Sequence, residues 1–176
     1  DGATALTEAM LVAAAQTKRH KVLVSQGVNP HYLATMRTYA HAAGIEVEVI
    51  PLQDGLTDLN FVRQQAGTAA AVMIQNPNFL GLIETVADFA APAHDVKALL
   101  VVSADPISLA LLEAPGNLGA DIVTGEGHGL GNGLNFGGPY LGIFATKKEL
   151  VRRIPGRLIG ATTDVSGKRG FVMTLQ

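Results

Sequence analysis

The chain contains no cysteine, few charged residues and no long apolar run. The absence of cysteine excludes disulfides, thiolate metal ligands and a cysteine nucleophile, and it fits a reducing compartment, so we expect a cytoplasmic protein. Charged residues make up 16% of the 176 positions, the net charge is −2, and no block of lysine or arginine stands out, so we expect no nucleic-acid partner. No apolar run approaches the roughly 18 residues that cross a membrane, so we expect no membrane partner.

The common motifs of nucleotide-binding proteins and hydrolases are also missing. In the glycine-rich loop at residues 125–140, glycine falls at every second position from Gly125 to Gly133, so no register gives the G-x-G-x-x-G pattern of a dinucleotide site. There is no phosphate-binding loop with a lysine and no G-x-S-x-G elbow. No pair of histidines or carboxylates has metal-ligand spacing, so we predict no metal site. The histidines expected at the surface are His20, His31, His41 and His94.

What the sequence does contain is an alternation of helical and strand patterns. Helices are predicted over residues 3–19, 29–44, 57–67, 81–94 and 105–114, and strands over residues 21–25, 45–50, 70–75, 98–103 and 120–125. The second helix has the clearest ends, with Asn29 as N-cap and Gly44 just beyond its last turn. Thr57 and Asp105 are the expected N-caps of two later helices, and Pro92 should kink or end the helix that contains it.

Repeated strand–helix–strand units predict an α/β fold, a mostly parallel sheet with helices on both faces. Only the glycine-rich loop separates the strand at 120–125 from the next strand, at 140–146. Because a parallel crossover normally uses a helix, this later strand should enter the sheet antiparallel. Thr146 and Glu149 then predict a capping box for a short helix over 147–154, followed by a loop and a hairpin-like or edge strand over 170–176.

Polar residues follow the predicted buried strands at the edge where open α/β sheets bind ligands. The expected cleft residues are Asn76 and Asn78 after one strand, Asp105 after the next, and Glu126 and His128 in the glycine-rich loop. Asn-Pro-Asn is also a usual turn sequence, and an Asp-Pro pair is a usual helix start. The alternative role for Asp105 is a carboxylate that holds the protonated ring nitrogen of pyridoxal phosphate. Because the five cleft residues are expected at the same edge of the sheet, we predict a cleft there.

Lysines are scarce near this edge. Only Lys147 and Lys148 lie near the glycine-rich loop, and as the first residues of a capped helix they should be solvated. A Schiff-base lysine needs a desolvated place that faces the cleft, so neither is expected to form one.

The run LNFGGPYLGIFATKKELVRRIPGRLIGATTDVSGKRGFVMTLQ closely resembles the P-protein of the glycine cleavage system, and more narrowly subunit 1 (alpha) of its split, two-gene form. The stretches DGATALTEAM, QNPNFLGLIE and DPISLALLEAPGNLGADIVTGEG fit the same family in order, so the resemblance covers the whole chain. It implies a fold-type-I pyridoxal-phosphate enzyme, whose large domain is a seven-stranded, mostly parallel sheet with one antiparallel strand. Residues 1–176 would form a single domain, the central part of that large domain, with the small domain absent. The start without methionine and the end within a strand pattern suggest a piece of a longer protein.

The resemblance also implies a role in glycine catabolism. The family decarboxylates glycine and transfers its aminomethyl group to the lipoyl group of H-protein, with pyridoxal phosphate held by a lysine of subunit 2 (beta). The corresponding place here is Gly127-His128, and a histidine cannot form the internal aldimine. We therefore expect a non-catalytic alpha subunit, with no catalytic residue of its own, in a heterotetramer with subunit 2. Its cleft residues could still shape the partner's pocket.

Two alternatives stay open. The chain could be a self-sufficient pyridoxal-phosphate aminotransferase or lyase, although the lysine inventory argues against this. It could also be a non-enzymatic assembly scaffold. Unchanged turnover after substitution of Glu126 or His128 in an intact complex would favour this alternative.

Overall fold

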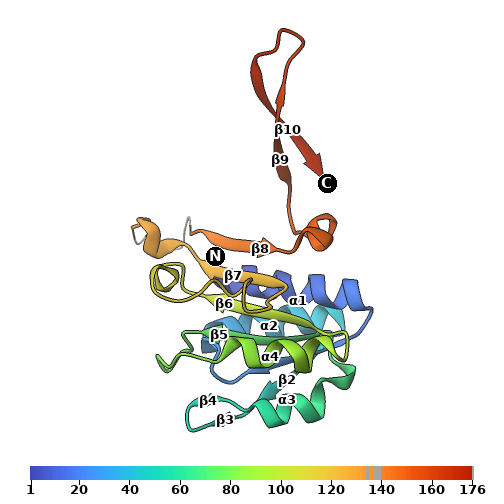
Figure 1. The fold of residues 1–176 in the computed structure, drawn as a ribbon, viewed down its shortest axis with the longest axis vertical. Coiled ribbons are helices and arrows are strands. Elements are labelled where there is room, and N and C mark those ends of the chain that lie inside the picture. The colour runs from blue at the N-terminus through green and yellow to red at the C-terminus, as the bar shows by residue number, and fades with distance from the viewer. Residues whose placement is uncertain (134, 137–139, 176) are drawn as a thin grey trace.

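The centre of the molecule is a six-stranded sheet with the order β2-β1-β5-β6-β7-β8 (Figure 1). The computed structural model describes residues 1–133, 135–136 and 140–175. The strands are β1 (Lys21–Ser25), β2 (Glu46–Ile50), β5 (Ala71–Asn76), β6 (Leu99–Ala104), β7 (Ile122–Glu126) and β8 (Gly142–Thr146). All neighbours pair in parallel except β7 and β8. The predicted α/β fold is confirmed, with six strands in the described sheet against the seven that the resemblance implies for a complete large domain.

The direction of β8 was set by its connection. β7 ends at the carboxyl edge of the sheet and β8 begins there, so that Glu126 pairs with Gly142 and Ile122 pairs with Thr146. Without a helix to carry the chain back to the opposite edge, a parallel strand is not accessible. The predicted antiparallel strand is therefore confirmed.

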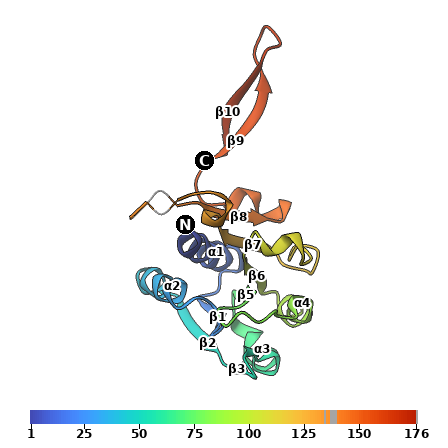
Figure 2. The same ribbon diagram turned by 90° about the vertical axis from the view of Figure 1, so that its left-hand side faces the viewer.

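Helices cover both faces of the sheet, as Figure 2 shows. One face carries α1 (Gly2–Thr17) and α2 (Pro30–Ala43), and the other carries α3 (Leu59–Gln65) and α4 (Val86–His94). Val22 and Val24 belong to the core beneath α1 and α2, whereas Leu23 between them belongs to the core beneath α3 and α4. Because successive side chains of a strand point to opposite faces, a sheet covered on both sides needs continuous apolar strands.

The ends of α2 lie where the sequence predicts them. Asn29 is the N-cap, and its side chain accepts the backbone N–H of His31 at 2.9 Å. Gly44 ends the helix with a φ of 65°, in the left-handed region that glycine tolerates. Both signals are local, which is why they can be recognised without the rest of the fold.

The cap of α3 differs from the prediction. Asp58, rather than Thr57, is the N-cap, and its side chain accepts two backbone N–H groups of the first turn. Thr57 is buried and hydrogen-bonds to Ser25 and Glu84. Its hydroxyl is therefore not available to cap the helix. The 3-10 turn η1 (Ala66–Thr68) follows α3.

The helix predicted over 81–94 is shorter. Residues before Val86 form a turn around Asn78, whose Oδ1 accepts the N–H groups of Leu80 and Leu82 at 3.0 and 3.1 Å. Pro92 lies inside α4, which ends shortly afterwards at His94.

The helix predicted over 105–114 is absent, and its place is taken by the 3-10 turn η2 (Ser108–Ala110). Asp105 closes a turn instead of capping an α-helix, since its Oδ1 accepts the N–H of Ile107 at 3.0 Å. Ile107 and Leu111 are 52% and 93% exposed. Helices in proteins depend largely on packing of an apolar face, and these apolar side chains are not packed against the described residues.

The capping box at Thr146 and Glu149 is also absent. The Thr146 hydroxyl donates to the carbonyl of Asp121 at 3.1 Å, and the segment forms the 3-10 helix η4 (Lys148–Arg153) without a side-chain cap. The glycine-rich loop holds a further short helix, η3 (His128–Leu130).

Two hairpins lie beside the main sheet. The tail forms β9 (Leu158–Thr163) and β10 (Arg169–Leu175), an antiparallel pair that projects away from the sheet in Figure 1. The sequence predicts the second of these strands but misses β9. The small hairpin of β3 (Leu52–Gln53) and β4 (Leu56–Thr57) is also missed.

Candidate functional site

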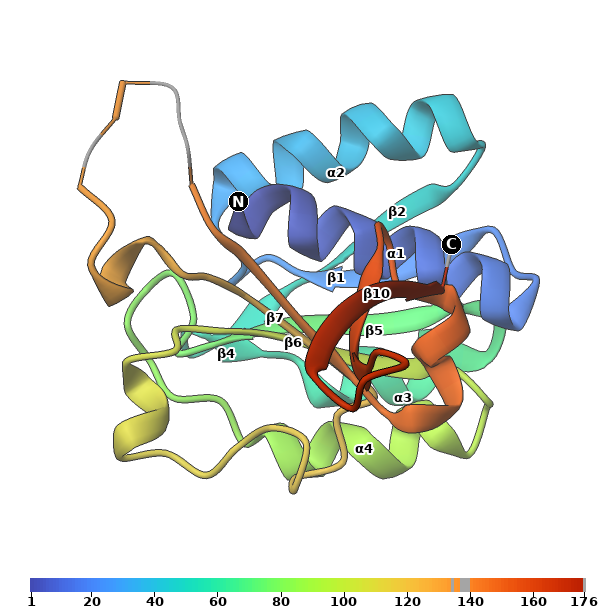
Figure 3. The same ribbon diagram turned by 90° about the horizontal axis from the view of Figure 1, so that it is seen from above.

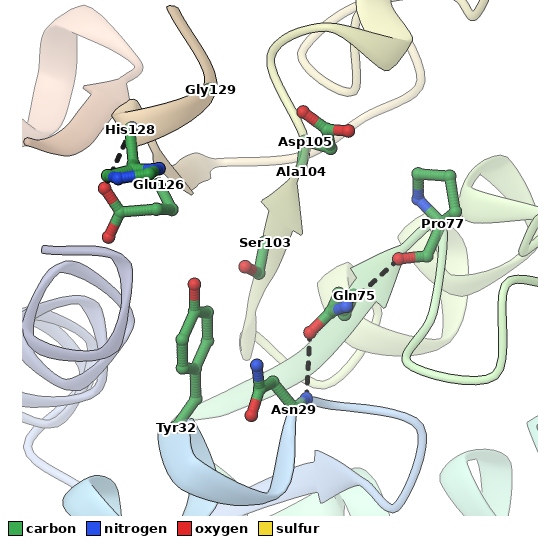
Figure 4. Close-up of a pocket in the computed structure, with 10 residues that line it drawn as sticks. All are labelled: Asn29, Tyr32, Gln75, Pro77, Ser103, Ala104, Asp105, Glu126, His128 and Gly129. Atoms are coloured by element: carbon green, nitrogen blue, oxygen red, sulfur yellow. Dashed lines mark hydrogen bonds between the residues drawn. The ribbon is translucent and has the colours of Figure 1, made fainter. Parts of the chain in front are cut away.

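A cavity of about 250 Å³ opens at the carboxyl ends of β5, β6 and β7, beside the first turn of α2. Figure 4 labels the residues that line it. Figure 3 shows that the N-terminal ends of α1 and α2 lie side by side at this end of the molecule. A wider hollow of about 610 Å³ adjoins the cavity along the start of α1 and shares Asn29, Tyr32, Glu126 and His128 with it. The site thus lies at the predicted edge of the sheet and is built from strand ends, the loops that follow them and the first turn of α2.

Three of the five expected cleft residues line the cavity, namely Asp105, Glu126 and His128. The other two do not. Asn76 accepts the N–H of Glu84 at 3.0 Å, and Asn78 donates to the Glu84 carboxylate at 2.9 Å. Both asparagines are buried and hold the turn after β5. Their observed role is therefore that of turn formers, which the Asn-Pro-Asn sequence also allows.

Strand alternation explains why the cavity uses the neighbours of Asn76. Met73 belongs to the core beneath α1 and α2, and Ile74 to the core beneath α3 and α4. Gln75 therefore shares the face of Met73, where the cavity lies, and Asn76 shares the other face. By the same rule Ser103, two positions after Val101, points to the cavity side (Figure 4).

Sequence reasoning missed four polar lining residues, Asn29, Tyr32, Gln75 and Ser103. The alternation of side chains along a strand could identify Gln75 and Ser103 as lining residues, but only once the face of the sheet that holds the cleft is known. The Asn29 backbone N–H donates to Gln75 Oε1 at 2.9 Å, and Gln75 Nε2 donates to the Pro77 carbonyl at 3.2 Å (Figure 4). These bonds fix the start of α2 against the end of β5.

Glu126 joins three parts of the site. Its Oε2 accepts the backbone N–H of Gly2 at 2.8 Å, and its Oε1 accepts the N–H of His128 at 3.0 Å. The carboxylate therefore sits at the N-terminus of α1, where a negative charge interacts favourably with the helix dipole. It also holds the first turn of the glycine-rich loop against the sheet.

Tyr32 and His128 complete the wall between the two hollows. Burial, and to a lesser extent the charge of Glu126, raises the pKa of Tyr32 above its ordinary value, so the phenol keeps its proton and remains a hydrogen-bond donor. The His128 ring packs against Tyr140, with 5.4 Å between ring centres and an angle of 51°. Its Nε2 is buried and has no hydrogen-bond partner among the described residues.

Asp105 carries the second carboxylate of the cavity. It lies at the end of β6, is exposed, and uses Oδ1 in the turn described above. Together with Glu126 it makes the lining anionic, and neither hollow is lined by a lysine or an arginine from the described residues. Such a lining attracts cationic groups and repels phosphates.

Within the described part of the chain, no group of three or more histidines and carboxylates is placed to hold a metal ion. No helix there has both the length and the apolar character needed to span a bilayer. The four histidines expected at the surface are exposed, and His94 also lies 2.8 Å from the Asp121 carboxylate.

The sheet order, the single antiparallel strand and the cleft at the carboxyl edge define the fold of the large domain of fold-type-I pyridoxal-phosphate enzymes. Residues 1–176 match the family model "Glycine cleavage system P-protein". The chain belongs to this family.

Relatives within the family are similar over the whole chain. "Probable glycine dehydrogenase (decarboxylating) subunit 1" of Moorella thermoacetica is 54% identical over 177 residues, and its counterpart in Chloroherpeton thalassium is 51% identical. The chain is fully covered in both alignments and spans 40% of the length of each relative.

Solved structures agree with this placement. A crystal structure of glycine decarboxylase (P-protein) in inhibitor-bound form has a TM-score of 0.94 and 50% identity, covering 100% of this chain and 40% of that one. A cysteine desulfurase from Thermococcus onnurineus has a TM-score of 0.69 and 23% identity over 99% of this chain and 44% of its own, and it shares the fold.

The residues of this cleft do not fit pyridoxal phosphate, the cofactor implied by the fold. The internal aldimine needs a lysine, and none of the described residues that line either hollow is a lysine. Lys147 and Lys148 are exposed, and Lys147 Nζ lies 2.6 Å from Asp121, which precedes β7 at the opposite edge of the sheet. The carboxylates of Asp105 and Glu126, which line the cavity, would also repel the cofactor's phosphate group. No step of a reaction through this cofactor is therefore assigned to this chain.

Proposed function

We propose that this chain is the central part of subunit 1 (alpha) of a split glycine decarboxylase and contributes no catalytic residue of its own. The complex would decarboxylate glycine and transfer the aminomethyl group to the lipoyl group of H-protein. Membership of the P-protein family and the names of the relatives support the pathway. The observation that carries the division of labour is the cleft without a lysine, with His128 at the place where the family's catalytic subunit is expected to hold its cofactor.

In this proposal residues 1–176 form one domain, the central part of a fold-type-I large domain, with the small domain elsewhere. Pyridoxal phosphate is bound to subunit 2 (beta), and the two subunits assemble as a cytoplasmic heterotetramer. Apolar side chains that are exposed around the cleft support the proposal that a partner subunit covers this surface. They come from the loops after β5, β6 and β7 and include Phe79, Leu80, Ile83, Ile107, Leu111 and Leu130.

Asp105, Glu126 and His128 are the residues we propose to shape the pocket from this side. Asp105 and Glu126 supply negative charge, and His128 supplies a buried ring nitrogen that can pair with a group from outside the described residues. Asn76 and Asn78 act one step away, by holding the loop after β5.

The test is reconstitution from separate proteins. The full chain, subunit 2 and lipoylated H-protein are combined, and release of carbon dioxide from glycine is measured with each component omitted in turn. Activity should require both subunits. Borohydride reduction in the presence of pyridoxal phosphate should label a lysine of subunit 2 and leave this chain unlabelled. A stoichiometric adduct on a lysine of this chain would instead identify a self-sufficient enzyme.

The scaffold alternative is separated by His128→Ala in the assembled complex. Reduced turnover with intact assembly, measured by sedimentation, supports a contribution of this chain to the pocket. Unchanged turnover with intact assembly identifies a scaffold. Glu113→Ala, which changes an exposed residue of the loop after β6, is the matched control.

A further inference from the structure

The N-terminus of α1 is the place in this cleft best suited to an anion. The helix has 16 residues, and Asp1, Ala3 and Thr4 at its start line the wider hollow beside the cavity. The free N–H groups and the dipole of a helix start favour phosphate and carboxylate groups. A phosphate-bearing ligand in the cleft would have these N–H groups as its natural partners.

Two of those N–H groups are already bonded to carboxylates of the chain itself. Glu126 Oε2 accepts the N–H of Gly2 at 2.8 Å, and Asp1 Oδ1 accepts the N–H of Thr4 at 2.8 Å. Glu126 comes from the end of β7, 124 positions along the chain, so its bond is a tertiary contact and not a local cap. The second oxygen of Glu126 is held by the N–H of His128 at 3.0 Å.

The space around this contact is tight. A Cβ atom on Gly2 would lie 2.5 Å from the Tyr32 hydroxyl oxygen and 3.0 Å from Glu126 Cβ. On the side of β8, a Cβ atom on Gly142 would lie 2.7 Å from the Asp1 carbonyl oxygen. These close approaches hold Gly2 and Asp1 in place, so a phosphate group could take the Gly2 N–H only by displacing the Glu126 carboxylate.

We infer that Glu126 is a built-in anion at the N-terminus of α1, which keeps this cleft in shape without a phosphate-bearing ligand and excludes such a ligand from it. The inference deepens the proposed function, which assigns the cofactor to subunit 2. It concerns only groups of this chain and can be tested without subunit 2, so it can fail while the reconstitution experiment succeeds, and the reverse.

The experiment uses inorganic phosphate as the probe and the full chain as the protein. Thermal unfolding is followed by circular dichroism with about 50 mM phosphate, and with sodium chloride at the same ionic strength, for the wild type, Glu126→Ala and Glu113→Ala. Phosphate stabilises many folded proteins without a specific site, so the exposed control variant measures that general effect. Binding of phosphate is measured in parallel by isothermal titration.

Glu126→Ala should lower the Tm by about 5 °C, because Gly2 and His128 lose a charged acceptor. Phosphate should restore about half of that loss and should bind this variant with saturation. The wild type and Glu113→Ala should show only the small, shared effect of phosphate. Glu126→Gln, which keeps the shape but loses the charge, should gain weak phosphate binding, and it replaces the alanine variant if that variant does not fold.

Two outcomes overturn the inference. If the wild type binds phosphate with saturation and Glu126→Ala binds it no better, the carboxylate does not exclude the anion. If neither Glu126 variant gains phosphate binding or a stabilisation beyond that of Glu113→Ala, the carboxylate does not stand in an anion's place.

Discussion

Replacement of Glu84 by alanine should destabilise the fold by about 4 kcal/mol, although this residue lies outside both apolar cores. Glu84 is 5% exposed, and its carboxylate accepts the N–H of Thr57 at 3.2 Å, the Thr57 hydroxyl at 2.9 Å and an N–H of Asn78 at 2.9 Å. In the alanine variant the Thr57 hydroxyl keeps Ser25 as a partner at 2.7 Å. The Thr57 N–H and one N–H of Asn78 lose their acceptor. Each buried donor without an acceptor lowers the stability of the fold by about 1–3 kcal/mol.

The assay is urea unfolding of the full chain, followed by circular dichroism and combined with a thermal scan. A loss of about 4 kcal/mol corresponds to a drop in Tm of about 10 °C for a chain of this size. Glu84→Gln keeps one acceptor oxygen and should lose about half as much, whereas Glu113→Ala at an exposed position should change stability by less than about 0.5 kcal/mol. If Glu84→Ala loses less than about 1 kcal/mol, the carboxylate does not hold the β3–β4 hairpin to the loop after β5, and the reasoning from buried donors is wrong.

Three other substitutions test ionisable groups at opposite edges of the sheet. Asp121 is 7% exposed, and its carboxylate accepts the N–H of Leu100 at 2.8 Å and contacts two side chains. Asp121→Asn should therefore lower the stability measured by thermal unfolding by about 2 kcal/mol. Lys147→Ala should lower it by less than about 1 kcal/mol, because the Lys147 side chain is 45% exposed. The reverse order would contradict this assignment. At the other edge, burial and the charge of Glu126 raise the pKa of Tyr32 above 10.0, so the folded state keeps the proton where the unfolded chain loses it, and stability should fall as the pH rises from about 10 through the folded pKa. Tyr32→Phe should show a shallower decline of Tm in that range and no difference in pH dependence below it, and identical slopes for the two proteins would contradict the prediction.

The parts of the fold that could be predicted depend on local signals or on rules of connection. Asn29, Pro30 and Gly44 fix both ends of α2 through their own backbone preferences. The direction of β8 follows from the connection before it, whose described residues contain only the short 3-10 helix η3. Neither inference requires knowledge of what the segment packs against, which is why both agree with the structure.

The parts that were missed depend on distant partners. Thr57 is as good an N-cap as Asp58 by residue type, but its hydroxyl is used by Ser25 and Glu84, which are far away in sequence. Residues 105–114 have a helical pattern, yet their apolar side chains remain at the surface. A pattern of apolar residues does not distinguish a face that packs within the chain from one that is left uncovered.

The candidate site shows the same limit. The sequence predicts the edge of the sheet at which polar residues gather, and the structure places Asp105, Glu126 and His128 there. The sequence does not predict on which side of the sheet the cavity lies. That side determines whether Gln75 or Asn76 lines the cavity. The contact between Glu126 and Gly2 joins the end of β7 to the start of α1, and no local pattern announces it.

The glycine-rich loop needs no cofactor to explain several of its glycines. A Cβ atom on Gly125 would lie 2.5 Å from the Ala104 carbonyl oxygen, and one on Gly127 would lie 2.6 Å from a methyl carbon of Leu141. Gly131 has a φ of 123°, which side chains rarely adopt. These three positions are constrained by the approach of β6, β7 and β8 and by the turn of the loop itself. A chain that lost its cofactor would therefore keep the glycines that its own packing requires, while the nucleophile and the anion site were free to change. The packing of the chain accounts for these glycines, and we propose that the side chains between them, here Glu126 and His128, decide the chemistry of the loop.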